Sequence, residues 1–165
     1  MGSHFATHKP VVRLLLREAI TSDAMVLAEL NAAASAHPWS ASQFDFDAER
    51  ILLIEHDAEP RGFIVFSYVL DVGSILNIAV RPDCQRRGMA AQLLTGALRA
   101  MGELGVDRCL LEVRSSNGGA AALYESFGFQ VDATRKNYYP AKTGREDAIL
   151  MSKNLLIPVP VGSNN

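Results

Sequence analysis

Cysteine is scarce in this sequence, with only Cys84 and Cys109 among its 165 residues. Two thiols form neither a disulfide framework nor a zinc-ligand set, so we expect no metal site and a reducing, cytoplasmic location. No apolar run approaches the roughly eighteen residues of a membrane-spanning helix, so we expect no membrane partner. The net charge is only −2, and so weak a charge argues against a direct nucleic-acid partner.

Two common phosphate-binding signatures are also absent. The sequence contains no G-x-x-x-x-G-K-[S/T] loop and no G-x-G-x-x-G turn. The first absence excludes a P-loop NTPase, and the second excludes the dinucleotide-binding fingerprint. A single small anionic ligand is not excluded, because one pair of arginines is enough to bind it.

The composition is that of one globular domain, since 48% of the residues are hydrophobic and the length suffices for a core. We expect residues 1–8, which begin "MGSH", to be a tag remnant or a disordered N-terminus. Residues 9–155 are expected to form a single domain. Residues 156–165, rich in Pro, Gly and Asn, are expected to form a flexible tail.

Seven apolar runs, separated by turn signals, predict strands. These runs lie at residues 11–19, 51–56, 62–70, 74–80, 108–114, 129–139 and 147–154. Helical patterns predict four helices, at about 22–34, in a short segment after Ser40, at 89–104 and at 117–128. Strand, helix and strand through 75–113 imply one parallel pair, so we predict an α/β (α+β) fold with a mixed, mostly antiparallel sheet.

The stretch "CQRRGMAAQLL" marks the change from strand to helix. A helix N-terminus has unpaired N–H groups, and Gly88 would let a phosphate approach them closely. Arg86 and Arg87 would add full positive charges. Taken alone, however, this stretch is more typical of a solvated turn than of a phosphate site.

Three residues downstream could carry chemistry. Strand alternation puts Glu112 on the face opposite Cys109 and Val113, and the seven-residue spacing puts Asn117 and Tyr124 on one side of a helix. Each also has an ordinary structural explanation: a polar strand residue, a helix N-cap and a core aromatic. The cysteines lack an evident His partner and are predicted to be packing residues, not nucleophiles.

Together these segments carry a family resemblance. The stretch "NIAVRPDCQRRGMAAQLL", followed by "LEVRSSN" and "ALYESFGF", resembles the GNAT acetyltransferases, with Gln85, Gly88 and Ala90 in their Q/R-x-x-G-x-G/A motif. The segments "HPWS", "RKNYYP" and "GREDAILM" are similar to the RimI branch, the bacterial ribosomal-protein-alanine N-acetyltransferases. The resemblance is densest from about Leu76 to Met151.

The resemblance implies a GNAT fold with a central splayed parallel strand pair and acetyl-CoA as cosubstrate. It implies Glu112 as general base, Tyr124 as general acid and Asn117 as a cofactor contact. The backbone along the pantetheine arm would come from Ile78, Ala79 and Val80. The pyrophosphate would be held by Arg86, Arg87, Gly88, Met89, Ala90 and Ala91.

The same resemblance implies a cytoplasmic monomer that acetylates the N-terminal alanine of a small-subunit ribosomal protein. Trp39, Tyr138 and Tyr139 are candidate walls for the acceptor peptide, although ordinary loop packing explains them equally well. Two alternatives stay open: an acetyltransferase for a small amine or other protein N-termini, and a non-catalytic acyl-CoA-binding module. The second alternative would need neither Glu112 nor Tyr124.

Overall fold

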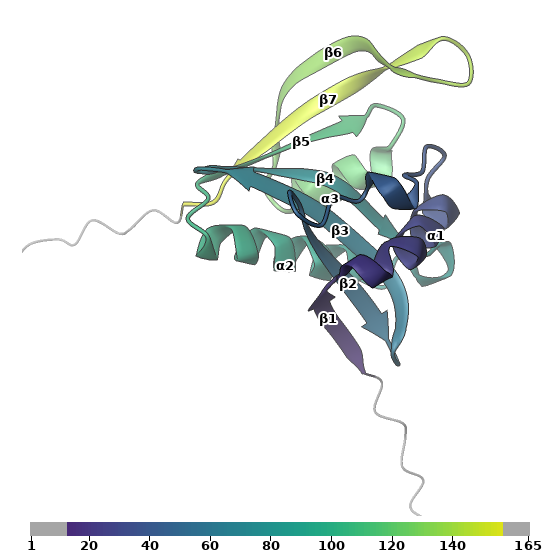
Figure 1. The fold of residues 1–165 in the computed structure, drawn as a ribbon. Helices are drawn as coiled ribbons and strands as arrows, with labels where there is room; N and C mark the ends of the chain where they lie inside the picture. The colour runs from purple at the N-terminus through teal and green to yellow at the C-terminus, as the bar shows by residue number, and fades with distance from the viewer. Residues whose placement is uncertain (1–12, 157–165) are drawn as a thin grey trace, which may run out of the picture.

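The computed structural model describes residues 13–156 (Figure 1). The expected N-terminal segment 1–8 and nearly all of the expected tail lie outside these residues. Within them the chain forms one mixed sheet with helices on both faces, in agreement with the predicted fold class.

The sheet contains the seven strands that the sequence predicts. They are β1 (Leu14–Glu18), β2 (Arg50–His56), β3 (Glu59–Val69), β4 (Val72–Val80), β5 (Arg108–Arg114), β6 (Gln130–Pro140) and β7 (Arg145–Asn154). Their order in the sheet is β1-β2-β3-β4-β5-β7-β6. Only the β4–β5 pair is parallel, and α2 provides its crossover.

Three of the predicted helices are α-helices: α1 (Ala24–Ala34), α2 (Met89–Glu103) and α3 (Gly118–Ser126). The fourth, expected after Ser40, is only a 3₁₀ turn over Ala41–Gln43. The Ser40 backbone amide donates to the Gln43 side chain at 2.8 Å at the start of this turn, but Phe44 then adopts an extended conformation. The Phe44 ring packs against Trp39 and Phe63, so aromatic contacts with the core end the turn.

Both faces of the sheet are covered at its centre. On one face α2 packs over Ile64 and Phe66 of β3, in the cluster that also contains Tyr124 of α3, and on the other face α1 packs over Phe63 and Val65. All four β3 side chains are fully buried. The predicted periodicity of α2 is confirmed, because its inward positions are buried: Leu93, Leu94, Ala97 and Met101.

The parallel pair separates partway along its length. Pairing joins Val72–Ile75 of β4 to Arg108–Leu111 of β5 and then stops. At that point β4 contains a bulge, because Val65 and Phe66 face Asn77 and Ile75 and leave Leu76 without a partner. A bulge bends its strand, and Glu112–Arg114 continue to pair with β7 on the other side. The sheet therefore opens between β4 and β5, as the predicted splay requires (Figure 1).

Candidate active site at the strand splay

A cavity of about 240 Å³ lies at the opening between β4 and β5. Five regions line it: the bulged part of β4, the end of β5, the start of α3, the loop after α1 and the end of β6. The predicted site residues among its walls are Trp39, Ile78, Glu112, Asn117, Tyr124 and Tyr139. Residues as far apart in the chain as Ser35 and Tyr139 thus line one cavity.

Glu112 lies at the mouth of this cavity. Cys109, Leu111 and Val113 are buried on the α2 side of β5, so the predicted alternation is confirmed. About a third of the Glu112 side chain is exposed, at 34%. One carboxylate oxygen lies 3.1 Å from the Arg135 guanidinium, and the other accepts a hydrogen bond from the Tyr139 hydroxyl at 3.4 Å.

Tyr139 is itself held in place by Arg114 of β5. The guanidinium of Arg114 lies 4.3 Å from the centre of the Tyr139 ring. Arg114 also donates to Glu146 at 2.8 Å and to the Pro140 carbonyl at 2.9 Å. Burial raises the pKa of Tyr139, and the neighbouring Glu112 charge raises it further. The Tyr139 hydroxyl therefore stays protonated beside Glu112 at neutral pH.

Tyr124 and Asn117 both face the cavity from α3, as their spacing predicts. Tyr124 is only 5% exposed and packs edge-on against Phe129, with 5.7 Å between ring centres. Burial raises the pKa of Tyr124 to about 12, so its hydroxyl stays protonated at neutral pH. The Asn117 side chain caps α3 by accepting from the Ala120 amide at 3.2 Å, which is the ordinary role considered for it.

The loop after α1 forms another wall. Asn31 is 1% exposed, and its side-chain oxygen accepts from the Trp39 amide at 2.7 Å and from the Asn77 side chain at 3.2 Å. This buried amide therefore ties the Trp39 loop to the bulged part of β4. Tyr138 differs from its neighbour, because it packs against Tyr139 and Arg135 and does not line the cavity.

The glycine turn lies at the start of α2, where Gly88 has a φ of +79°. A side chain at this position would meet nothing within 4 Å, so the surface here is open. Gln85 donates to the Val80 carbonyl at 3.0 Å and anchors the turn to β4. Arg86 and Arg87 are exposed, and within residues 13–156 neither forms an ion pair.

The other predicted cofactor residues flank this turn. Met89 is buried at 4%, so only its backbone could contact a ligand, whereas Ala90 and Ala91 are half-buried. Ile78, Ala79 and Val80 pair with β3 on one edge, and the opposite edge faces the splay. Of the residues from Ile78 to Ala91, only Ile78 lines the splay cavity.

Sequence reasoning missed three residues that build this site: Asn31, Arg114 and Arg135. Alternation places Arg114 on the same face of its strand as Glu112, but that placement alone predicts no role for Arg114 in the site. Arg135 and Asn31 reach the site through cross-strand and loop contacts, for which the sequence carries no local signal.

Both cysteines are buried, and burial raises the pKa of the Cys109 thiol to about 12. Neither residue lines the splay cavity, which agrees with their predicted role in packing. In the part of the chain that the structure describes, no three His, Cys, Asp or Glu side chains gather as metal ligands. None of its helices is long and apolar enough to cross a membrane.

Residues 17–129 match the Acetyltransferase (GNAT) family, and the chain belongs to that family. It is 42% identical over 135 residues to the [ribosomal protein bS18]-alanine N-acetyltransferase of Salmonella typhimurium, covering 80% of this chain and 91% of that protein. The protein of the same name from Escherichia coli is 40% identical with the same coverage. The crystal structure of the Escherichia coli ribosomal-protein-S18-alanine N-acetyltransferase superposes with a TM-score of 0.84 at 34% identity, covering 90% of this chain and 98% of that one.

These similarities confirm the predicted family, its acyltransferase class and the resemblance to the ribosomal-protein-alanine branch. Members of the family use acetyl-CoA, which agrees with the open, basic turn at Gly88.

Proposed function

We propose that this protein transfers an acetyl group from acetyl-CoA to the N-terminal α-amine of a protein, the N-terminal alanine of ribosomal protein bS18. The observation that carries the proposal is that Glu112 and Tyr124, from different elements, line the same cavity. Relatives that are 40–42% identical to this chain over 135 residues and carry the bS18 name support the choice of acceptor.

Glu112 is the proposed general base. An N-terminal amine has a pKa near 8, so most of it is protonated at neutral pH and must lose a proton before it can attack. A carboxylate accepts this proton directly or through one water. The hydrogen bond from Tyr139 and the ion pair with Arg135 would hold the carboxylate at the cavity mouth during this transfer.

Tyr124 is the proposed general acid. When the new amide forms, the bond between the acetyl carbon and sulfur breaks, and the sulfur leaves with a negative charge that needs a proton. The raised pKa of Tyr124 keeps its hydroxyl protonated, so this side chain carries the proton that the leaving sulfur needs. Backbone N–H groups on the free edge of β4 would stabilise the charge that develops on the carbonyl oxygen.

The residues around the glycine turn fit an acetyl-CoA pyrophosphate. The first amides of α2 lack partners within the helix, and Gly88 leaves open space before them. Arg86 and Arg87 would add charge-assisted hydrogen bonds. Ile78, Ala79 and Val80 would offer backbone groups to the pantetheine arm, and Asn117 would contact the cosubstrate near α3.

The lining of the splay cavity supports a peptide acceptor over a polyamine. A polycationic amine favours several carboxylates, but Glu112 is the single acidic residue among the cavity walls and is already paired with Arg135. Trp39 and Tyr139 would flank the peptide N-terminus, with Tyr138 behind them. We further propose that the enzyme acts as a monomer in the cytoplasm, where ribosomal proteins are made.

Mass spectrometry of a peptide substrate tests this function. A peptide that carries a bS18 N-terminus beginning with alanine and an internal lysine is incubated with the enzyme and acetyl-CoA. We expect one added acetyl group, which fragmentation locates on the α-amine, and no reaction of the same peptide with a blocked N-terminus. Acetylation of the lysine alone, or preference for a competing polyamine, would overturn the proposal.

A further inference from the structure

A second and larger cavity, of about 570 Å³, adjoins the splay cavity. The two share Ile75, Leu76, Glu112 and Tyr139 as walls. The larger one, called here the outer groove, lies on the outward face of β5, β7 and β6. That face is open, because α1 packs on β3 and β4 and the other two helices cover the opposite side (Figure 1).

The floor of the outer groove is apolar. Leu110 of β5 and Leu150 of β7 are half-buried there, and the bulged Leu76 is 41% exposed. These three side chains offer apolar surface that no other part of the described chain covers. A ligand that covered them would gain the free energy of apolar burial.

The charged side chains that line the outer groove form ion pairs with one another. Arg135 contacts Glu112 at 3.1 Å at one end, and Arg108 contacts Asp132 at 3.2 Å at the other. Arg108 also donates to Ser152 at 3.0 Å. Because each positive group faces a negative one, the groove carries no net charge that would attract a charged side chain.

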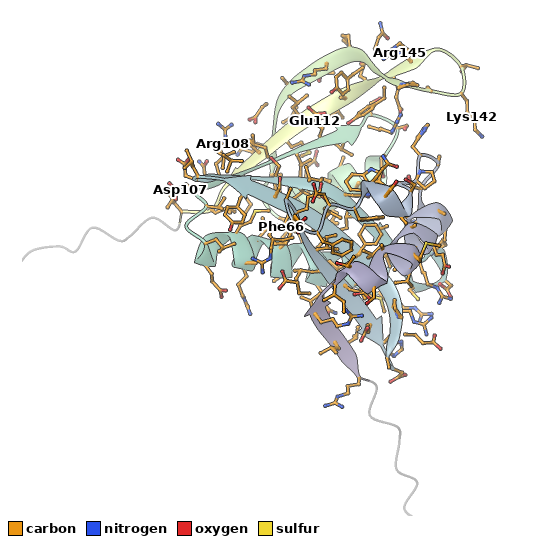
Figure 2. All side chains as sticks on the ribbon, viewed as in Figure 1. Phe66, Asp107, Arg108, Glu112, Lys142 and Arg145 are labelled. Atoms are coloured by element: carbon orange, nitrogen blue, oxygen red, sulfur yellow. The ribbon has the colours of Figure 1, made fainter. Side chains whose placement is uncertain are left out.

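The groove runs away from the proposed general base. Glu112, Leu110 and Arg108 share one face of β5, and Figure 2 shows Arg108 toward the closed end of the splay. Strand residues advance by about 3.3 Å each, so Leu110 lies roughly 7 Å from Glu112 along the strand. An extended peptide advances by a similar distance per residue. With its α-amine at Glu112, its second or third side chain reaches Leu110.

We infer that the outer groove is an acceptor subsite that binds an uncharged apolar side chain at the second or third residue of the acceptor protein. This inference rests on the proposed function and adds a specificity determinant to it. The first residue of the peptide would enter the splay, and its second or third residue would lie across Leu110 and Leu150.

Competing peptides test the inference. Two alanine-first peptides are compared, one with leucine and one with serine at positions two and three, and each position is then exchanged singly. For the unaltered enzyme we expect kcat/KM to be at least about tenfold higher for the leucine peptide. Leu110→Thr should reduce this ratio to near one by raising KM for the leucine peptide, with the affinity for acetyl-CoA unchanged.

Val131→Thr provides a matched control, because Val131 is 55% exposed on neighbouring β6 and does not line the groove. Threonine suits a strand in both variants, and the control should keep the full leucine preference. Equal acetylation of both peptides by the unaltered enzyme would overturn the subsite and leave the proposed function standing. Acetylation of neither would overturn both.

Discussion

At the residue scale, one of the contacts that hold the Glu112 side chain in place does not require a negative charge on it. The Tyr139 hydroxyl donates to one of its oxygens, and a glutamine could accept the same bond. We therefore predict that Glu112→Gln keeps the local structure and the acetyl-CoA affinity but lowers kcat by about 100-fold or more, because the amide cannot accept a proton. Steady-state kinetics and isothermal titration with acetyl-CoA measure the two effects separately.

Glu103→Gln is the matched control for this prediction, because Glu103 is exposed at the end of α2 and lines neither cavity. It should leave kcat unchanged. Full kcat in the Glu112→Gln enzyme would remove Glu112 from the role of general base.

At the element scale, the glycines at the two ends of α2 allow the effect of backbone strain to be measured apart from the effect on ligand binding. Gly88 before the helix has a φ of +79° and Gly105 after it has a φ of +80°, and a side chain at either position meets nothing within 4 Å. Gly88→Glu and Gly105→Glu should therefore cost similar amounts of stability, on the order of 1 kcal/mol.

Only Gly88→Glu puts a negative charge where the pyrophosphate is proposed to bind. We predict that it raises the Kd for acetyl-CoA by at least about tenfold, whereas Gly105→Glu leaves the Kd unchanged. Isothermal titration measures both values, and thermal melting checks that the two variants lose similar stability. Normal acetyl-CoA affinity of the Gly88 variant would show that the phosphates bind elsewhere.

The elements that the sequence predicts best are those whose pattern reflects burial. The alternation around Glu112 and the periodicity of α2 follow from which side chains face the core. The predicted helix after Ser40 fails because Phe44 makes its aromatic contacts in an extended conformation. Tertiary contacts overrode the local helical preference there.

The sequence likewise predicts some features of the candidate site and not others. The family motifs identify Glu112, Asn117 and Tyr124, and the structure brings all three to one cavity. The ion pair between Arg135 and Glu112 joins strands that are separated by β7 in the sheet. No local pattern encodes such a contact, because it depends on the register of two strand pairs and on the bulge between Arg135 and Tyr139.

At the scale of the whole molecule, one buried cluster joins the core to the candidate site. Cys109 and Tyr124 belong to the same cluster, beneath α2 and α3, and are 0% and 5% exposed. Burial raises the pKa of Cys109 from 9.0 to about 12 and that of Tyr124 from 10.0 to about 12. The folded protein therefore keeps both protons at pH values where the unfolded chain releases them.

Because the two pKa values are higher in the folded protein than in the unfolded chain, alkaline pH lowers the free energy of unfolding. Below pH 9 both groups are protonated in both states, so neither makes stability depend on pH. Between pH 9 and about 12 the unfolded chain binds fewer protons, and the free energy of unfolding falls as the pH rises. Cys109 alone should contribute a loss of about 1 kcal/mol per pH unit once its unfolded thiol has ionised.

We predict that Cys109→Ala lowers stability at pH 8 by creating a small cavity but then loses less stability than the unaltered protein between pH 9 and pH 10. Tyr124→Phe should lessen the loss above pH 10, whereas Tyr68→Phe, at a residue that is 40% exposed, should leave the slope unchanged. Urea denaturation at half-unit pH steps measures the slopes. Parallel curves for all four proteins would mean that the Cys109 thiol and the Tyr124 hydroxyl titrate in the folded protein as they do in the unfolded chain, and that the cluster beneath α2 admits water.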